Sequence, residues 1–147
     1  MTIRILALAT LLASTCYAAP DKVQYELQER CGKTCKDAFE REWGRNGVVN
    51  NDDGQMRATY QNHYSVRLNK CFYLEEVTTY PINKTQSVHE DQVLYDINEN
   101  KQYGNFHRMY NYVGPYGDIP PATCYVLDKP CRSKNEWDAL VRPYMEE

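Results

Sequence analysis

The sequence predicts an α+β domain in which an N-terminal helix, an antiparallel β-meander of about four to five strands and a C-terminal helix follow in that order. Apolar residues recur at helical spacing near both ends of the chain, and the segments between them alternate between apolar and polar residues. In addition, cysteines spread over both kinds of segment predict that disulfide bonds staple the domain.

The first predicted helix spans residues 24–43. Its apolar stripe follows spacings of three and four residues and consists of Leu27, Cys31, Cys35, Ala38 and Phe39. Gly44 follows directly, and glycine readily adopts the left-handed conformation that ends many helices. We therefore expect one face of this helix to pack against the sheet.

The central part of the chain shows strand patterns separated by turn-forming residues. Asparagine, aspartate and glycine dominate residues 46–54, which predicts a turn region, and residues 98–101 predict a hairpin turn. Three prolines and two glycines predict a loop over residues 111–121. The predicted strands cover residues 56–61, 70–80, 93–97, 103–110 and 123–127.

The C-terminal helix has a clear start signal. Ser133 and Glu136 have the spacing of a capping box, in which each side chain accepts a hydrogen bond from the other residue's backbone N–H. Pro143 lacks a backbone donor, so we expect the regular helix to end near Arg142. The apolar stripe of this helix consists of Trp137, Leu140, Val141 and Tyr144.

Residues 1–18 have the three-part form of a secretory signal peptide. Arg4 precedes an apolar run, and small residues, Cys16 and Ala18, stand where signal peptidase requires them for a cut after Ala18. The remaining residues 19–147 then form a single domain in the periplasm or outside the cell, with no transmembrane segment. A lipoprotein anchor at Cys16 is less favoured, because Ala13 and Thr15 depart from the usual lipidation signal.

Removal of the signal leaves an odd number of cysteines in a chain bound for an oxidising compartment. Cys124 and Cys131 are seven residues apart around a turn, so we expect a disulfide bond between them. Cys71 is expected to pair with either Cys31 or Cys35, which share one face of the first helix. A zinc site is disfavoured because a second closely spaced pair of ligands is missing. We accordingly expect no metal and no cofactor.

Charge and motifs exclude several classes of protein. The 147 residues carry a net charge of −3 and contain no basic block, which disfavours nucleic-acid binding. Motifs for a serine nucleophile or a phosphate-binding loop are absent from the sequence. Glu75 and Glu76 are adjacent in a predicted strand and therefore point to opposite faces, so they make a poor acid–base pair. We assign no catalytic residue, and the balance is against an enzyme.

One stretch, residues 62–72, combines aromatic, imidazole, guanidinium, amide and ammonium groups. Clustered donors beside exposed rings would suit a small anionic or sugar-like ligand. The alternative, which we favour here, is a corner between two strands that is held by ordinary structural hydrogen bonds. The candidate ligand-binding residues are His63, Tyr64, Arg67, Asn69 and Lys70.

Several segments together resemble a group of small secreted bacterial proteins with no assigned activity. They are residues 29–32, 63–64, 67–72, 96–101, 103–104, 131–138, 140–141 and 143–145. The resemblance implies a bacterial source, and hence the periplasm or the medium. Cys35 is an extra residue relative to that pattern, which supports Cys31 as the partner of Cys71.

These observations together favour a non-catalytic binding or structural module of the bacterial envelope. Its partner would be another envelope protein or a small ligand. Two alternatives come from other classes of protein: a secreted inhibitor of a hydrolase, which would present the loop at residues 111–121, and a small periplasmic enzyme.

Overall fold

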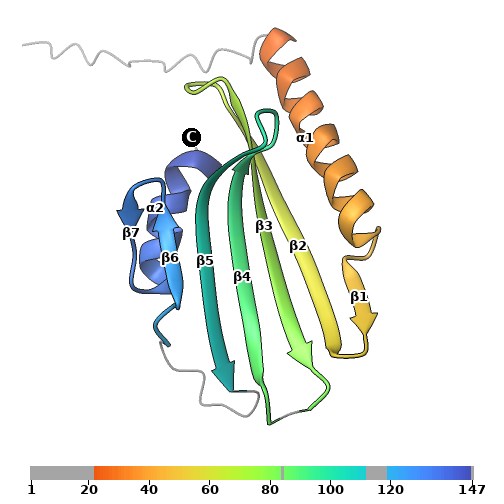
Figure 1. Cartoon of the computed structure of the whole chain (residues 1–147). Coiled ribbons are helices and arrows are strands. Elements are labelled where there is room, and N and C mark those ends of the chain that lie inside the picture. The colour runs from red at the N-terminus through yellow and green to blue at the C-terminus, as the bar shows by residue number, and fades with distance from the viewer. Residues whose placement is uncertain (1–21, 84, 112–118, 147) are drawn as a thin grey trace, which may run out of the picture.

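The computed structural model describes residues 22–83, 85–111 and 119–146, and there the chain forms two helices and one seven-stranded sheet (Figure 1). An α+β domain with disulfide bonds is thus confirmed, whereas the expected number of four to five strands is wrong. The elements are α1 (Lys22–Trp43), β1 (Val48–Asn51), β2 (Gly54–Ser65), β3 (Lys70–Pro81), β4 (Ser87–Asp96), β5 (Lys101–Asn111), β6 (Thr123–Val126), β7 (Lys129–Pro130) and α2 (Lys134–Met145).

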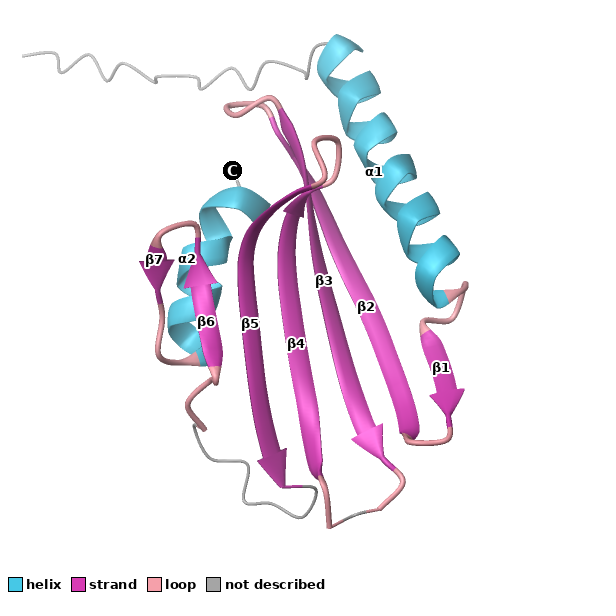
Figure 2. Ribbon diagram, viewed as in Figure 1, coloured by secondary structure: helices cyan, strands magenta, loops and turns pink. Residues whose placement is uncertain are grey.

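The sheet is a simple meander. Its strands lie side by side in the order in which they occur along the chain, and every neighbouring pair is antiparallel. Four long strands, β2 to β5, form the body of the sheet, and the short strands β1 and β6–β7 extend its two edges (Figure 2). Antiparallel neighbours can be joined directly, without a crossover helix between them.

Two strands were not expected because each lies inside a segment rich in turn signals. β1 has four residues and lies within residues 46–54. A turn precedes it and another follows it, so the whole segment is rich in turn-forming residues. The second of these turns is closed by Asn51, whose Oδ1 accepts hydrogen bonds from the backbone N–H groups of Asp53 and Gly54. β7 has two residues and pairs with β6 across the corner that precedes α2.

Each helix covers a different face of the sheet. Side chains in a strand alternate between the two faces, and β3 shows the consequence most clearly. Cys71 and Tyr73 belong to a core with α1 residues, whereas Phe72 lies in a second core beneath α2, where Leu74 packs against it. Two separate apolar clusters therefore lie on opposite faces of the sheet.

The stripe predicted for α1 is confirmed. Cys31, Cys35 and Phe39 are buried against β2 and β3. The ring of Phe39 lies 4.7 Å from that of Tyr60, measured between centroids. Cys31 forms a disulfide bond with Cys71, so that a covalent bond ties the middle of the helix to the sheet.

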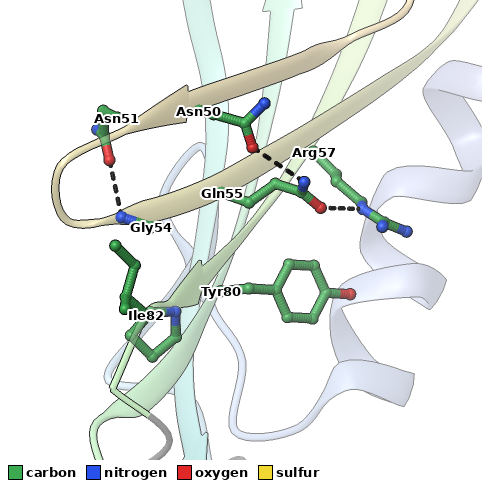
Figure 3. Close-up of a pocket in the computed structure, with 8 residues that line it drawn as sticks. Asn50, Asn51, Gly54, Gln55, Arg57, Tyr80 and Ile82 are labelled. Atoms are coloured by element: carbon green, nitrogen blue, oxygen red, sulfur yellow. Dashed lines mark hydrogen bonds between the residues drawn. The ribbon is translucent and has the colours of Figure 1, made fainter.

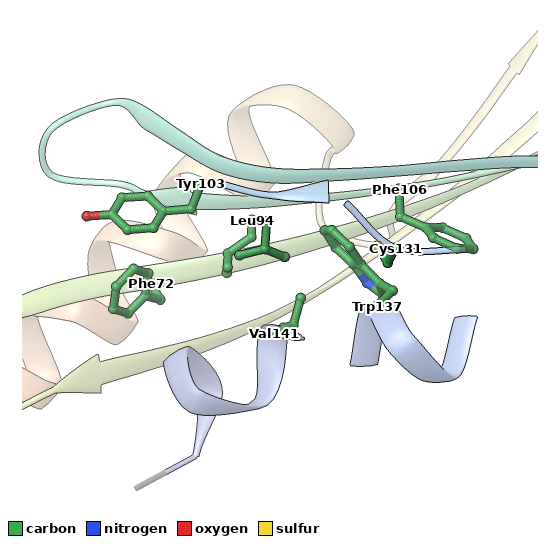
Figure 4. Close-up of a cluster of buried hydrophobic side chains, with 8 residues drawn as sticks. Phe72, Leu94, Tyr103, Phe106, Cys131, Trp137 and Val141 are labelled. Carbon is green, nitrogen blue, oxygen red and sulfur yellow. The ribbon is translucent and has the colours of Figure 1, made fainter. Parts of the chain in front are cut away.

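The centre of the second core is the indole ring of Trp137 (Figure 4). This side chain is fully buried, and its Nε1 donates a hydrogen bond of 2.6 Å to Oε1 of Gln92. Its ring approaches β5 so closely that a Cβ atom at Gly104 would lie 3.1 Å from it and 2.8 Å from the carbonyl oxygen of Tyr125. Glycine at position 104 therefore leaves the room that the indole occupies.

The start of α2 is confirmed and its end is not. Ser133 Oγ accepts a hydrogen bond from the backbone N–H of Glu136, while the Glu136 carboxylate accepts one from the N–H of Arg132 rather than Ser133. The expected end near Arg142 is wrong, because α2 continues through Pro143 to Met145. Proline lacks the N–H for one helical hydrogen bond but already has a helical φ. Beyond it, the Glu146 N–H still donates a hydrogen bond to the Arg142 carbonyl oxygen.

The second disulfide bond joins Cys124 to Cys131, as expected, and Cys35 is a buried free thiol. Two disulfide bonds indicate an oxidising compartment outside the cytoplasm. Of the two helices in the described part of the chain, neither has the length and apolar character needed to cross a membrane. The signal peptide, its cleavage site and Cys16 lie outside the described residues.

Trp137→Ala is expected to destabilise the protein by about 3–5 kcal/mol, because it leaves a large cavity in the second core. Glu136→Ala should cost only about 1 kcal/mol, because it removes a single contact at the helix start. Urea unfolding of both variants measures the two costs. An unfolding midpoint of Trp137→Ala equal to that of the parent would contradict the burial of this ring.

Peptide mapping without reduction should recover Cys31 linked to Cys71 and Cys124 linked to Cys131. Cys35 should react with a thiol reagent only after unfolding, because it is fully buried in the native protein. Recovery of a Cys35–Cys71 peptide from native protein would refute the pairing described here.

Candidate functional site

A pocket of about 250 Å³ lies between the C-terminal half of α1 and the sheet. We refer to it as the α1 pocket. Glu42 and Ala38 reach it from α1, one helical turn apart, and the remaining side chains come from β3, β4 and the turn that follows β4. These are Tyr73, Glu75, Tyr95, Ile97 and Asn100. The pocket thus has two carboxylates and two phenol rings in its wall.

Glu75 is held in place by two donors. Its Oε1 accepts a hydrogen bond of 2.9 Å from Trp43 Nε1 and another of 2.9 Å from the hydroxyl of Tyr73. One donor comes from the last residue of α1 and the other from the same strand. The carboxylate therefore has a defined position whenever the helix is docked on the sheet.

The pKa shifts in the α1 pocket come first from loss of hydration and then from nearby negative charge. Loss of hydration and the nearby Glu75 carboxylate raise the pKa of Glu42. Burial, followed by Glu75, raises the pKa of both Tyr73 and Tyr95, and Glu42 contributes in the same direction. Both phenols thus remain neutral hydrogen-bond donors at physiological pH, and the pocket is an environment that favours a positive charge.

Beside the pocket, three sulfur atoms meet in the core under α1. The Sγ atoms of Cys31, Cys35 and Cys71 lie within 4.8 Å of one another, and Cys35 Sγ is 3.6 Å from Cys71 Sγ. Two of the three are already joined in a disulfide bond, and burial raises the pKa of Cys35 to about 12. Thiolates, not thiols, bind metals and attack disulfide bonds. Because its raised pKa keeps Cys35 a neutral thiol, we assign the three sulfur atoms to core packing.

A second hollow, of about 550 Å³, lies where β1, β2 and the end of β3 meet (Figure 3). Gln55 bridges its neighbours, since its Nε2 donates to Asn50 Oδ1 and its Oε1 accepts from Arg57 Nε. The Arg57 guanidinium lies 5.6 Å from the centre of the Tyr80 ring. Figure 3 shows Gln55 hydrogen-bonded to both Asn50 and Arg57, so much of the polar capacity of this hollow is already used and it is the weaker candidate.

The five residues proposed from the sequence lie at the end of β2, in the turn that follows it and at the start of β3. His63 and Tyr64 are neighbours in β2 and point to opposite faces of the sheet. The Tyr64 hydroxyl donates to Asn69 Oδ1, and the Lys70 ammonium lies 2.6 Å from Asp96 and 2.7 Å from Glu99. Hydrogen bonds to these two carboxylates raise the pKa of Lys70.

Exposed Arg67 lies in the turn between β2 and β3, and Nε2 of His63 is buried without a hydrogen-bond partner among the described residues. Ligand binding at these residues stays a prediction.

Sequence reasoning missed the pair formed by Glu42 and Glu75. The sequence predicts that Glu75 and Glu76 point to opposite faces of the sheet. The carboxylate on the same side as Glu75 is that of Glu42, which belongs to a helix more than thirty residues earlier in the chain. A usable signal was present, because Glu42 follows Ala38 by four residues and so lies beside the apolar stripe of the helix.

Comparison with protein-family models, with curated proteins and with solved structures gives no match to this chain.

Glu42→Gln is expected to stabilise the protein at neutral pH. The folded state raises the pKa of Glu42, so it binds a proton more tightly than the unfolded chain does. Ionisation of Glu42 then opposes folding, and stability is lost as the pH rises from about 4 through the raised pKa. The advantage of Glu42→Gln over the parent in urea unfolding should therefore be larger at pH 7 than at pH 4.

Glu29→Gln, at an exposed position of α1, is the control for the loss of one negative charge. An equal, pH-dependent gain in that variant would assign the effect to net charge and not to the α1 pocket.

Proposed function

We propose that the protein is a non-catalytic binding module of the bacterial envelope, and that its α1 pocket takes a positively charged side chain of a partner protein. The observation that carries this proposal is the placement of Glu42 and Glu75 with two tyrosines around one cavity. The disulfide bonds agree with a location in the periplasm or outside the cell.

The chemistry of the pocket suits a cation in two ways. Carboxylates attract an ammonium or guanidinium group directly, and in a partly desolvated site this attraction is stronger than in water. Tyrosine rings add a cation–π contribution of about 0.5–2 kcal/mol when a cation lies over the ring face. The pKa of Glu42 is raised first by loss of hydration and then by repulsion from Glu75, and a bound cation would offset this repulsion.

The size of the pocket restricts the ligand. Sites for cofactors and drug-sized ligands usually occupy about 300–1,000 Å³. The α1 pocket is smaller, at about 250 Å³, and accepts one lysine or arginine side chain or a small amine. A partner protein that presents such a side chain would obtain further affinity from the surface around it.

An acid–base enzyme is the alternative that the same carboxylates support. A pair of carboxyl groups that flanks one cavity can act as acid and base in glycoside hydrolysis. Binding is the better-supported function, because Glu75 already accepts two hydrogen bonds and the cavity is small for a sugar chain. For the proposed inhibitor loop, residues 112–118 lie outside the described part of the chain.

Nuclear magnetic resonance titration of residues 19–147 tests the proposal. The probes are the N-acetyl methylamides of lysine and arginine, with the uncharged norleucine compound as a control of similar shape. We expect the charged probes to shift signals of α1 and β3 with a dissociation constant on the order of 1 mM. Glu75→Gln should weaken binding at least tenfold, and affinity should rise with pH as Glu42 ionises.

Glu76→Gln is the matched control, because Glu76 is the sequence neighbour of Glu75 on the opposite face. Equal binding of the norleucine probe, or equal losses in the two variants, would refute a cation site. Hydrolysis of chromogenic glycosides that Glu42→Gln abolishes would establish the enzyme instead.

A further inference from the structure

The sheet face that carries α1 is only partly covered by it. The helix packs on β2 and β3, whereas the β4 and β5 side chains of the same face are half-buried or exposed. His89 and Asp91 of β4 lie there directly opposite Met109 and His107 of β5, respectively. Directly opposed side chains of antiparallel strands have Cβ atoms about 4.5–5.5 Å apart, and diagonal ones remain within reach of each other.

The two histidines are close neighbours. Their ring centroids are 5.6 Å apart. When two imidazoles bind one metal ion, each through a ring nitrogen about 2.0–2.1 Å from the ion, their ring centroids are about 5–6 Å apart. Met109, which is 45% exposed, pairs with His89 and places a thioether on the same surface. Three nitrogen and sulfur ligands of metal-binding type thus gather on two adjacent strands.

Asp91 orients one of these ligands. Its Oδ1 lies 2.7 Å from Nδ1 of His107. When a neutral His107 donates its Nδ1–H to this carboxylate, the lone pair of the ring is on Nε2. Carboxylates commonly hold metal-binding histidines in this way, since the contact fixes the tautomer and increases the basicity of the free nitrogen.

We propose that His89, His107 and Met109 form a binding site for a single copper(I) ion, with Asp91 as the positioning residue. Imidazole is a ligand for zinc, copper, iron and nickel, whereas a thioether selects soft ions such as copper(I). Copper(I) is the ion that both ligand types favour. An open hollow of about 460 Å³, lined by His89 and Met109, gives the ion access from solvent.

The copper site is independent of the function proposed for the α1 pocket. His89 is six residues from Tyr95 along β4, which corresponds to about 20 Å in a strand. The two sites therefore share a face of the sheet but no residue, and failure of one leaves the other unaffected.

Anaerobic titration of residues 19–147 with copper(I) against bicinchoninate, with both disulfide bonds intact, tests the proposal. We expect one copper(I) ion per chain. Met109→Leu and His107→Gln should each weaken copper(I) binding at least tenfold, and Met109→Leu should leave zinc(II) binding unchanged. Because Met109 is exposed, its replacement by leucine should not impair folding, which the unfolding midpoint checks.

Two controls separate this site from the other candidate ligands. His63→Gln removes the remaining histidine, which lies on the opposite face, and Cys35→Ala removes the free thiol. Neither exchange should change the affinity for copper(I). Loss of binding in Cys35→Ala, equal loss of zinc(II) and copper(I) in Met109→Leu, or no binding by the parent would each overturn the proposal.

The role of Asp91 has its own readout. Asp91→Asn should weaken copper(I) binding and change the ¹⁵N shifts that report the tautomer of His107. Unchanged shifts with unchanged affinity would show that Asp91 does not position this ligand.

Discussion

β3 presents alternate side chains to two different cores, and this alternation determines which face of the sheet each helix covers. Cys71 and Phe72 are adjacent in the chain, yet one is bonded to α1 and the other is buried under α2. A strand buried on both faces has a strongly specified register, because a slip of one residue would exchange its two sets of side chains. The disulfide bond to Cys31 and the burial of Trp137 against Gly104 then fix where each helix lies.

The same alternation distributes the polar residues between structural and candidate functional positions. Glu75 faces the α1 pocket, while its neighbour Glu76 lies on the α2 face and accepts a hydrogen bond from Gln92. Gln92 in turn accepts the indole N–H of Trp137. These polar side chains on the α2 face are thus paired within the fold. Both proposed sites are on the other face, where the single helix leaves part of the sheet open.

A raised pKa does not by itself identify a functional residue here. Burial, with Glu90 as the next cause, raises the pKa of Glu76, yet this carboxylate belongs to a hydrogen-bonded network under α2. Glu42 differs because it borders a cavity and its charged neighbour is fixed on the opposite wall. The cavity, and not the direction of the pKa shift, is what makes a ligand-binding function physically reasonable.

Local signals were sufficient to predict both helices, five of the strands and the bond between Cys124 and Cys131. Each of these depends on residues close together in the chain, where periodicity and spacing are informative. The two short strands were not predicted because turn-forming residues surround them. The five proposed ligand-binding residues lie on both faces of the sheet and in the turn that follows β2. Only tertiary structure decided which cysteine bonds to Cys71, which carboxylate faces Glu75 and which thioether lies opposite His89. These pairs depend on the rotation of α1 on the sheet and on the register between strands, which no local pattern specifies.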